Sequence, residues 1–97
     1  MEKLALLARL EAKPGKEKEV SEFIESAVAL AQSEAMTIRW YALQLGPSTF
    51  GVFDTFESED GRKAHLSGPI RQALLARADE LLATPPTIES VTLLAVK

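Results

Sequence analysis

The spacing of apolar residues changes repeatedly along the chain, and the order of these changes restricts the fold more than any other feature. Four segments rich in alternating apolar, β-branched or aromatic residues predict strands, at residues 4–13, 36–45, 49–56 and 88–96. Two others repeat apolar side chains every three or four positions and predict amphipathic helices, at residues 16–33 and 69–83. Ser58 favours a third, brief helix, because serine caps helix N-termini well.

The predicted elements follow the order β-α-β-β-α-β, with turn residues between them. Lys13-Pro14-Gly15-Lys16 ends the first strand, and Gly46-Pro47-Ser48 joins the second and third strands as an antiparallel hairpin. Right-handed crossovers and short connections leave few arrangements for such a chain. We therefore expect residues 1–97 to form one α+β domain, a ferredoxin-like plait with both helices on one face of a four-stranded antiparallel sheet.

Large apolar residues occur on both faces of the predicted strands. In the third strand Phe50, Val52 and Phe56 share one face, while Phe53 lies on the other. A sheet covered by helices on one face should alternate apolar with polar residues, because its second face meets water. Exposing each large apolar side chain costs about 1.5–3 kcal/mol, so we predict a homodimer joined through the sheet faces. Ordinary surface hydrophobics are the alternative.

Composition limits the partners of the chain. Its 11 basic and 14 acidic residues give a net charge of −3, which argues against binding to nucleic acid. The absence of cysteine excludes disulfides, thiolate chemistry and cysteine-ligated metals. No apolar run reaches ~18 residues, and the first residues are too charged for a signal peptide. We expect a soluble, cytoplasmic protein without a membrane partner.

Three segments, in this order and spacing, resemble the antibiotic-biosynthesis monooxygenase family. They are the helix start Lys13-Pro14-Gly15-Lys16, the strand segment Thr37-Ile38-Arg39-Trp40, and the strand–turn–helix segment Phe53-Asp54-Thr55-Phe56-Glu57-Ser58-Glu59 leading into Ala64-His65-Leu66. The resemblance spans nearly the whole chain. It implies a dimeric α+β barrel, each subunit of which holds its own pocket between sheet and helices. The family includes cofactor-independent quinone-forming oxygenases, quinol monooxygenases and haem degraders.

Carried over position by position, the resemblance implies that His65 matches the family's helix histidine, which haem-degrading members use as an axial ligand. Phe56 stands where those members and the cofactor-free oxygenases place a tryptophan. The chain also contains no asparagine to match the one in their pocket. These two departures count most against haem degradation.

His65 is the only histidine and the candidate catalytic base, because imidazole titrates near ~6.5. Asp54 shares a strand face with Phe56 and is expected to orient the imidazole. We expect a planar aromatic substrate to contact four aromatic residues: Trp40, Tyr41, Phe23 and Phe56. Tyr41 could also donate a hydrogen bond to a phenolate. No cofactor is expected, since a deprotonated, electron-rich aromatic can reduce oxygen itself.

Three interpretations follow. The first is a cofactor-independent monooxygenase that oxidises a phenolic, quinol or polyketide-like aromatic with molecular oxygen. The second is a non-catalytic dimeric barrel that binds a planar hydrophobic ligand such as haem, and the third is a purely structural role. Asp54 could instead pair with a backbone amide, Arg62 or Lys63, and the aromatic residues could simply be core. One histidine among scattered carboxylates is poor geometry for a transition metal, so no metal site is expected.

Overall fold

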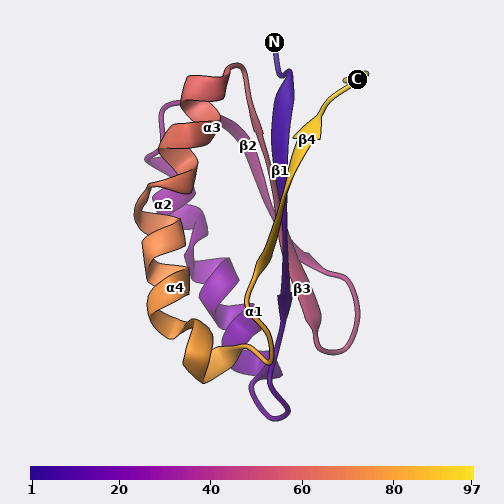
Figure 1. Cartoon of the computed structure of the whole chain (residues 1–97), viewed down its shortest axis with the longest axis vertical. Coiled ribbons are helices and arrows are strands. Elements are labelled where there is room, and N and C mark those ends of the chain that lie inside the picture. The colour runs from indigo at the N-terminus through magenta and orange to yellow at the C-terminus, as the bar shows by residue number, and fades with distance from the viewer.

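The computed structural model describes residues 1–97 and has the predicted order of strands and helices. The elements are β1 (Leu4–Glu11), α1 (Glu17–Ser26), α2 (Val28–Gln32), β2 (Thr37–Gln44), β3 (Thr49–Phe56), α3 (Glu59–Leu66), α4 (Pro69–Leu81) and β4 (Thr87–Thr92). The strands form one sheet in the order β2-β3-β1-β4, and all neighbours are antiparallel. All helices lie on one side of this sheet (Figure 1). The ferredoxin-like plait is therefore confirmed.

Local sequence signals explain where several elements begin. The Ser58 hydroxyl accepts a hydrogen bond from the Gly61 amide at 3.3 Å and caps α3, as predicted. Pro69 occupies the first turn of α4, where its missing N–H costs nothing. The turn after β1 contains Gly15 at a φ of 86°, a left-handed conformation that glycine adopts without strain.

Two predicted boundaries were wrong. The helix expected over residues 16–33 is divided into α1 and α2 at Ala27, whose amide is shared between the carbonyls of Phe23 and Ile24. The last strand ends at Thr92 instead of residue 96. Its only neighbour is β1, which starts at Leu4, and the last bond runs from the Leu93 amide to the Lys3 carbonyl. Beyond that point an edge strand has no backbone partner.

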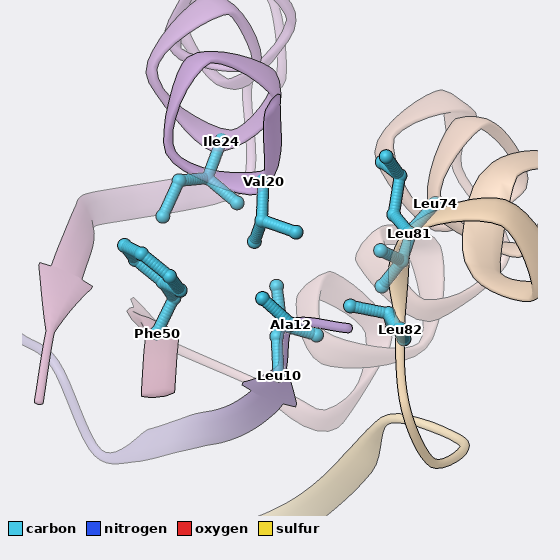
Figure 2. Packing of buried hydrophobic residues seen from close by; sticks show 8 residues of the cluster. All are labelled: Leu10, Ala12, Val20, Ile24, Phe50, Leu74, Leu81 and Leu82. Atoms are coloured by element: carbon cyan, nitrogen blue, oxygen red, sulfur yellow. The ribbon is translucent and has the colours of Figure 1, made fainter. Parts of the chain in front are cut away.

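The main core lies at the end of the sheet where β1 finishes and β3 begins. Figure 2 shows Val20 and Ile24 of α1 facing Leu10 and Phe50 of the sheet, with side chains of α4 beside them. A smaller buried cluster, made of Ala27, Ala31 and Ile70, joins α2 to α4. Together the two clusters hold the helices against the sheet.

The other face of the sheet carries no helix (Figure 1). On this outer face Tyr41 stacks on its cross-strand partner Phe53, with ring centroids 6.5 Å apart. Tyr41 and Leu45 are 45% and 47% exposed. Two ion pairs also connect the strands. One joins Arg9 of β1 to Glu89 of β4, and the other joins Arg39 of β2 to Glu2, which precedes β1. None of the helices is long and apolar enough to cross a membrane.

Candidate functional site

The imidazole of His65 lies between two carboxylates. His65 is on α3, and its side chain is only 10% exposed. Nδ1 lies 2.7 Å from Oε1 of Glu34, and Nε2 lies 2.7 Å from Oδ2 of Asp54. The ring therefore has a negatively charged neighbour at each nitrogen, and its orientation is fixed from both sides.

Glu34 approaches from the connection between α2 and β2. Its Oε1 also accepts a hydrogen bond from the Thr37 hydroxyl at 2.9 Å, so this oxygen is held by two donors. The second oxygen, Oε2, is buried without a hydrogen-bond partner. It faces the start of α4, because a Cβ placed on Gly68 would lie 3.2 Å from it. The positive end of the α4 dipole favours a carboxylate there.

Asp54 approaches from β3 and is almost completely buried, with 1% of its surface exposed. Its Oδ2 is close enough to Nε2 of His65 for an ion pair, but no N–H or O–H donor is aligned with it as a hydrogen bond. A buried charge needs a compensating charge nearby, and the imidazolium form of His65 supplies one. Asp54 thus retains an unused acceptor position beside the imidazole.

The environment of His65 changes its proton affinity in two opposing ways. Burial by itself lowers the pKa of the imidazole, but the Asp54 carboxylate, followed by that of Glu34, more than compensates. The net result raises the pKa of His65 from 6.5 to about 8. At neutral pH the ring is mainly a cation, and it becomes a neutral base only under mildly alkaline conditions.

A small apolar cavity adjoins this group between the helices and the sheet. Twelve of its fifteen lining residues are hydrophobic, and the other three are Asp54, His65 and Arg71. Its volume is about 50 Å³, enough for water but below the ~300 Å³ typical of small-molecule sites. An aromatic ring can enter only if wall side chains move.

Four of the six predicted site residues line this one cavity. They are His65, Asp54, Trp40 and Phe23. Phe56 is completely buried beside the imidazole, with ring centroids 5.5 Å apart, and does not line the cavity. It packs against His65 and is not part of the cavity wall.

The placement of Tyr41 beside these residues was wrong. Tyr41 pairs with Phe53 on the outer face of the sheet, where both side chains border a different hollow. Successive residues of a strand point to opposite faces, so Trp40 and Tyr41 cannot share a site on one side of the sheet. A hydrogen bond from Tyr41 to a phenolate beside His65 is thereby excluded within one chain.

Sequence reasoning missed Glu34 and Arg71. Glu34 stands 31 positions before His65, and no periodic pattern relates the two. One local signal was present, because Glu34 follows the C-terminus of α2, where the helix dipole disfavours a carboxylate unless a cation pairs with it. Arg71 sits in the first turns of α4 as an apparently ordinary surface residue, yet it lines the cavity.

No group of three or more histidine, cysteine, aspartate or glutamate side chains is arranged to hold a metal ion. The trio of His65, Asp54 and Glu34 does not form such a group, since its carboxylates contact the imidazole itself. The arrangement instead suits proton transfer. It provides an imidazole held from both sides and a carboxylate facing an apolar space.

Similar folds and one close relative are found among solved structures. NE2512, a protein of unknown function from Nitrosomonas europaea, is 58% identical, with a TM-score of 0.98 over 100% of this chain and 94% of that one. A candidate antibiotic biosynthesis monooxygenase from Nitrosomonas europaea is 15% identical, with a TM-score of 0.83 over 95% and 90% of the two chains. Another from Caulobacter crescentus is 18% identical, with a TM-score of 0.81 over 97% and 92%.

The two monooxygenase-like structures establish a shared fold, because their sequence identities are too low to establish more. The predicted resemblance to the antibiotic-biosynthesis monooxygenase family is confirmed at the level of the fold. No protein-family model and no curated protein sequence matches the chain.

Proposed function

Because the chain belongs to the same family as NE2512 and has the fold of candidate antibiotic biosynthesis monooxygenases, we propose that it is a cofactor-independent monooxygenase. Its substrate is a phenolic, quinol or polyketide-like aromatic. The observation that carries this proposal is the imidazole of His65, held between Glu34 and Asp54 beside an apolar cavity.

The first step is removal of the substrate's hydroxyl proton. The O–H bond of the substrate breaks, and an N–H bond forms at Nε2 of neutral His65, while Asp54 beside it stays ionised. Glu34 holds Nδ1 and so fixes the tautomer that leaves Nε2 available. The resulting imidazolium lies between two carboxylates, which stabilise it. Its positive charge also offsets the negative charge of the new phenolate.

The phenolate is electron-rich and can pass electrons to molecular oxygen without a cofactor. In the oxidation of an anthrone, the ring CH₂ loses four electrons and becomes C=O. One oxygen atom enters the product, and the other leaves as water with the two hydrogens, while His65 gives back the proton that it took. Atoms and electrons balance with oxygen as the only oxidant. The apolar walls favour this step, because oxygen partitions into apolar space and water is kept from the reactive anion.

Access to the site requires movement of its walls. Phe23, Leu66 and Arg71 line the cavity and are all partly exposed. They belong to α1, the end of α3 and the start of α4, and the last two elements meet at the Ser67-Gly68 break. Leu66 and Arg71 at this junction lie outside the main core cluster, whereas Phe23 packs against it, so opening at the junction disturbs that core least.

Oxygen uptake tests the proposal directly. The wild-type protein is incubated with an anthrone or a hydroquinone, and dissolved oxygen and product are followed with and without air. We expect His65→Ala to reduce turnover by about 10²–10⁴-fold, the range of a lost general base. Lys63→Ala is the matched control, because Lys63 is an exposed residue of the same helix. Equal turnover in wild type and His65→Ala would refute the assignment of His65 as the base.

Haem binding is less well supported than oxygenation. Glu34 holds Nδ1 of His65, and an iron atom at Nε2 would have to displace the Asp54 carboxylate, whose Oδ2 lies 2.7 Å from that nitrogen. The cavity of about 50 Å³ also has no room for a porphyrin. Titration with haem gives an independent check, since binding through His65 produces a Soret shift that His65→Ala abolishes.

We also propose that two copies associate through the outer sheet faces. Tyr41, Phe53, Leu43 and Val91 form an apolar strip on the outer face, which no helix covers, although the C-terminal residues border one end of it. The ion pairs Arg39–Glu2 and Arg9–Glu89 neutralise charge beside it. A face that is apolar and charge-balanced is self-complementary, which suits a twofold symmetric contact.

A further inference from the structure

Arg71 on α4 is the only arginine of the chain that has no ion-pair partner. A glutamate pairs with each of the other four arginines, which are Arg9, Arg39, Arg62 and Arg77. The side chain of Arg71 is partly buried, yet its guanidinium makes no hydrogen bond within the chain. Its five N–H donors are therefore left to water or to a ligand.

The position of Arg71 on its helix makes the missing partner more costly. Arg71 lies in the first turn of α4, where the positive end of the helix dipole disfavours a second positive charge. That turn contains no acidic residue. The Glu34 carboxylate faces the start of the helix, but it is bound to His65 and makes no ion pair with Arg71. An anion beside Arg71 would thus meet two favourable charges, the guanidinium and the helix N-terminus.

Arg71 is also the one charged residue of the cavity wall that is free to bind an anion. The other two, Asp54 and His65, already face each other at 2.7 Å, and the remaining wall is hydrophobic. Because Arg71 is partly exposed, it borders both the cavity and the solvent. A ligand with its apolar part in the cavity can therefore place a charged group at Arg71 without removing that group fully from water, which would be costly.

We propose that Arg71 binds a carboxylate of the ligand where the apolar cavity meets solvent. A planar carboxylate matches the guanidinium, since two N–H groups can donate to its two oxygens. A phosphate monoester fits less well, because it carries about two negative charges and the wall offers one free cation.

Within the proposed function, on which this assignment rests, the substrate is an aromatic carboxylic acid. Its acidic group lies beside the start of α4, and its apolar ring lies in the cavity. The reverse orientation would bring the substrate carboxylate towards the buried carboxylate of Asp54, and like charges repel strongly in such surroundings. Arg71 acts as a binding residue and takes no part in the proton transfer.

Two probes of the same shape test this contact without any turnover. They are 2-naphthoate and its neutral amide, 2-naphthamide, and calorimetry at low ionic strength measures their binding. Trp40 is the only tryptophan and lines the cavity, so a shift of its indole N–H resonance shows that a probe is bound there. In the wild type we expect the naphthoate to bind at least about tenfold more tightly than the amide. Added salt should reduce this preference.

Arg71→Gln removes the positive charge and is expected to lose most of the preference. It should weaken the binding of 2-naphthoate and leave that of 2-naphthamide unchanged. Arg71→Lys keeps the charge without the planar fork and should retain part of the preference. Arg77→Gln is the matched control, because Arg77 is a partly exposed arginine of the same helix that is already paired with Glu80. It should leave both affinities unchanged.

Three outcomes would overturn the carboxylate contact: equal binding of the two probes to the wild type, a full preference retained in Arg71→Gln, or no binding of either probe. Failure of the proposed function is a separate result. A clear preference for 2-naphthoate without oxygen uptake on any hydroquinone or anthrone would contradict the oxygenase while supporting the contact. Oxygen uptake without the preference would do the reverse.

Discussion

Oε1 of Glu34 lies 2.7 Å from Nδ1 of His65, although 31 positions separate the two residues in the chain. The contact joins α3 to the connection between α2 and β2, and it turns the second imidazole nitrogen towards Asp54. One buried contact thus fixes the orientation, the charge and the available nitrogen of the only histidine.

Removing the charge of Glu34 should lower the proton affinity of His65. In Glu34→Gln we expect the pKa of His65 to fall below its wild-type value of about 8, because one of the two carboxylates that raise it is lost. The Cε1 proton of the single histidine gives one NMR resonance to follow against pH. Glu22→Gln, an equal charge change at an exposed site on α1, is the control and should leave the titration unchanged. An unaltered pKa in Glu34→Gln would contradict the structure.

Stability should depend on pH through the same histidine. The folded pKa of about 8 exceeds the unfolded value of about 6.5, so protonation favours the folded state. The contribution is fully present below about pH 6.5 and is lost as pH rises through 8. The difference of about 1.5 between the folded and unfolded pKa values corresponds to about 2 kcal/mol in the free energy of unfolding. Urea unfolding between pH 6 and 9 measures it, and His65→Gln should lack this decline.

Activity should show the opposite dependence on pH. If neutral His65 accepts the substrate's proton, kcat/KM rises with pH and levels off above the pKa of about 8. We expect a value at pH 7 about tenfold below the plateau. The measurement uses a substrate whose own ionisation lies well above this range. A rate that is flat from pH 6 to 9 would point to a different base.

The outer face of the sheet should hold two subunits together. Sedimentation of the wild type at micromolar concentration is expected to show a dimer, and Phe53→Glu to show a monomer, because a charge then replaces the centre of the apolar strip. Leu75→Glu is the control, since Leu75 is 53% exposed on the helical side. A wild-type monomer, or equal disruption by both variants, would count against the interface.

The main core, at the end of the sheet where β1 finishes, should be sensitive to truncation of its side chains. Leu10 is 1% exposed within the main cluster (Figure 2), so Leu10→Ala is expected to destabilise the protein by about 2–5 kcal/mol. Leu75→Ala at an exposed position of α4 should change stability by less than about 0.5 kcal/mol. Chemical unfolding compares the two. Similar losses in both variants would show that the cluster is packed differently.

Local sequence patterns predicted the strands and helices of the fold. The period of the apolar residues gave all four strands and both long helical segments, and Ser58 and Pro69 marked helix starts correctly. One of the two errors, the end of the last strand, concerns a boundary that depends on a distant partner. The last strand stops at Thr92 because β1 begins at Leu4, a fact about the neighbouring strand that the residues after Thr92 do not encode.

The sequence predicted the candidate site only in part. Strand parity correctly placed Asp54 on the helix side, and the same parity, applied to β2, separates Trp40 from Tyr41. Pooling the aromatic residues by type ignored that rule and put Tyr41 in the wrong place. Glu34 could not be found, because its pairing with His65 arises only when α3 packs beside the connection between α2 and β2.

By itself the sequence determined the order of the elements, the side of the sheet that each strand residue faces and the presence of a single imidazole, since these follow from spacing and identity alone. Tertiary structure decided which charges surround that imidazole and how much space lies beside it. The physical reason is that pKa and cavity volume depend on side chains brought together from separate elements, at distances that no local pattern specifies.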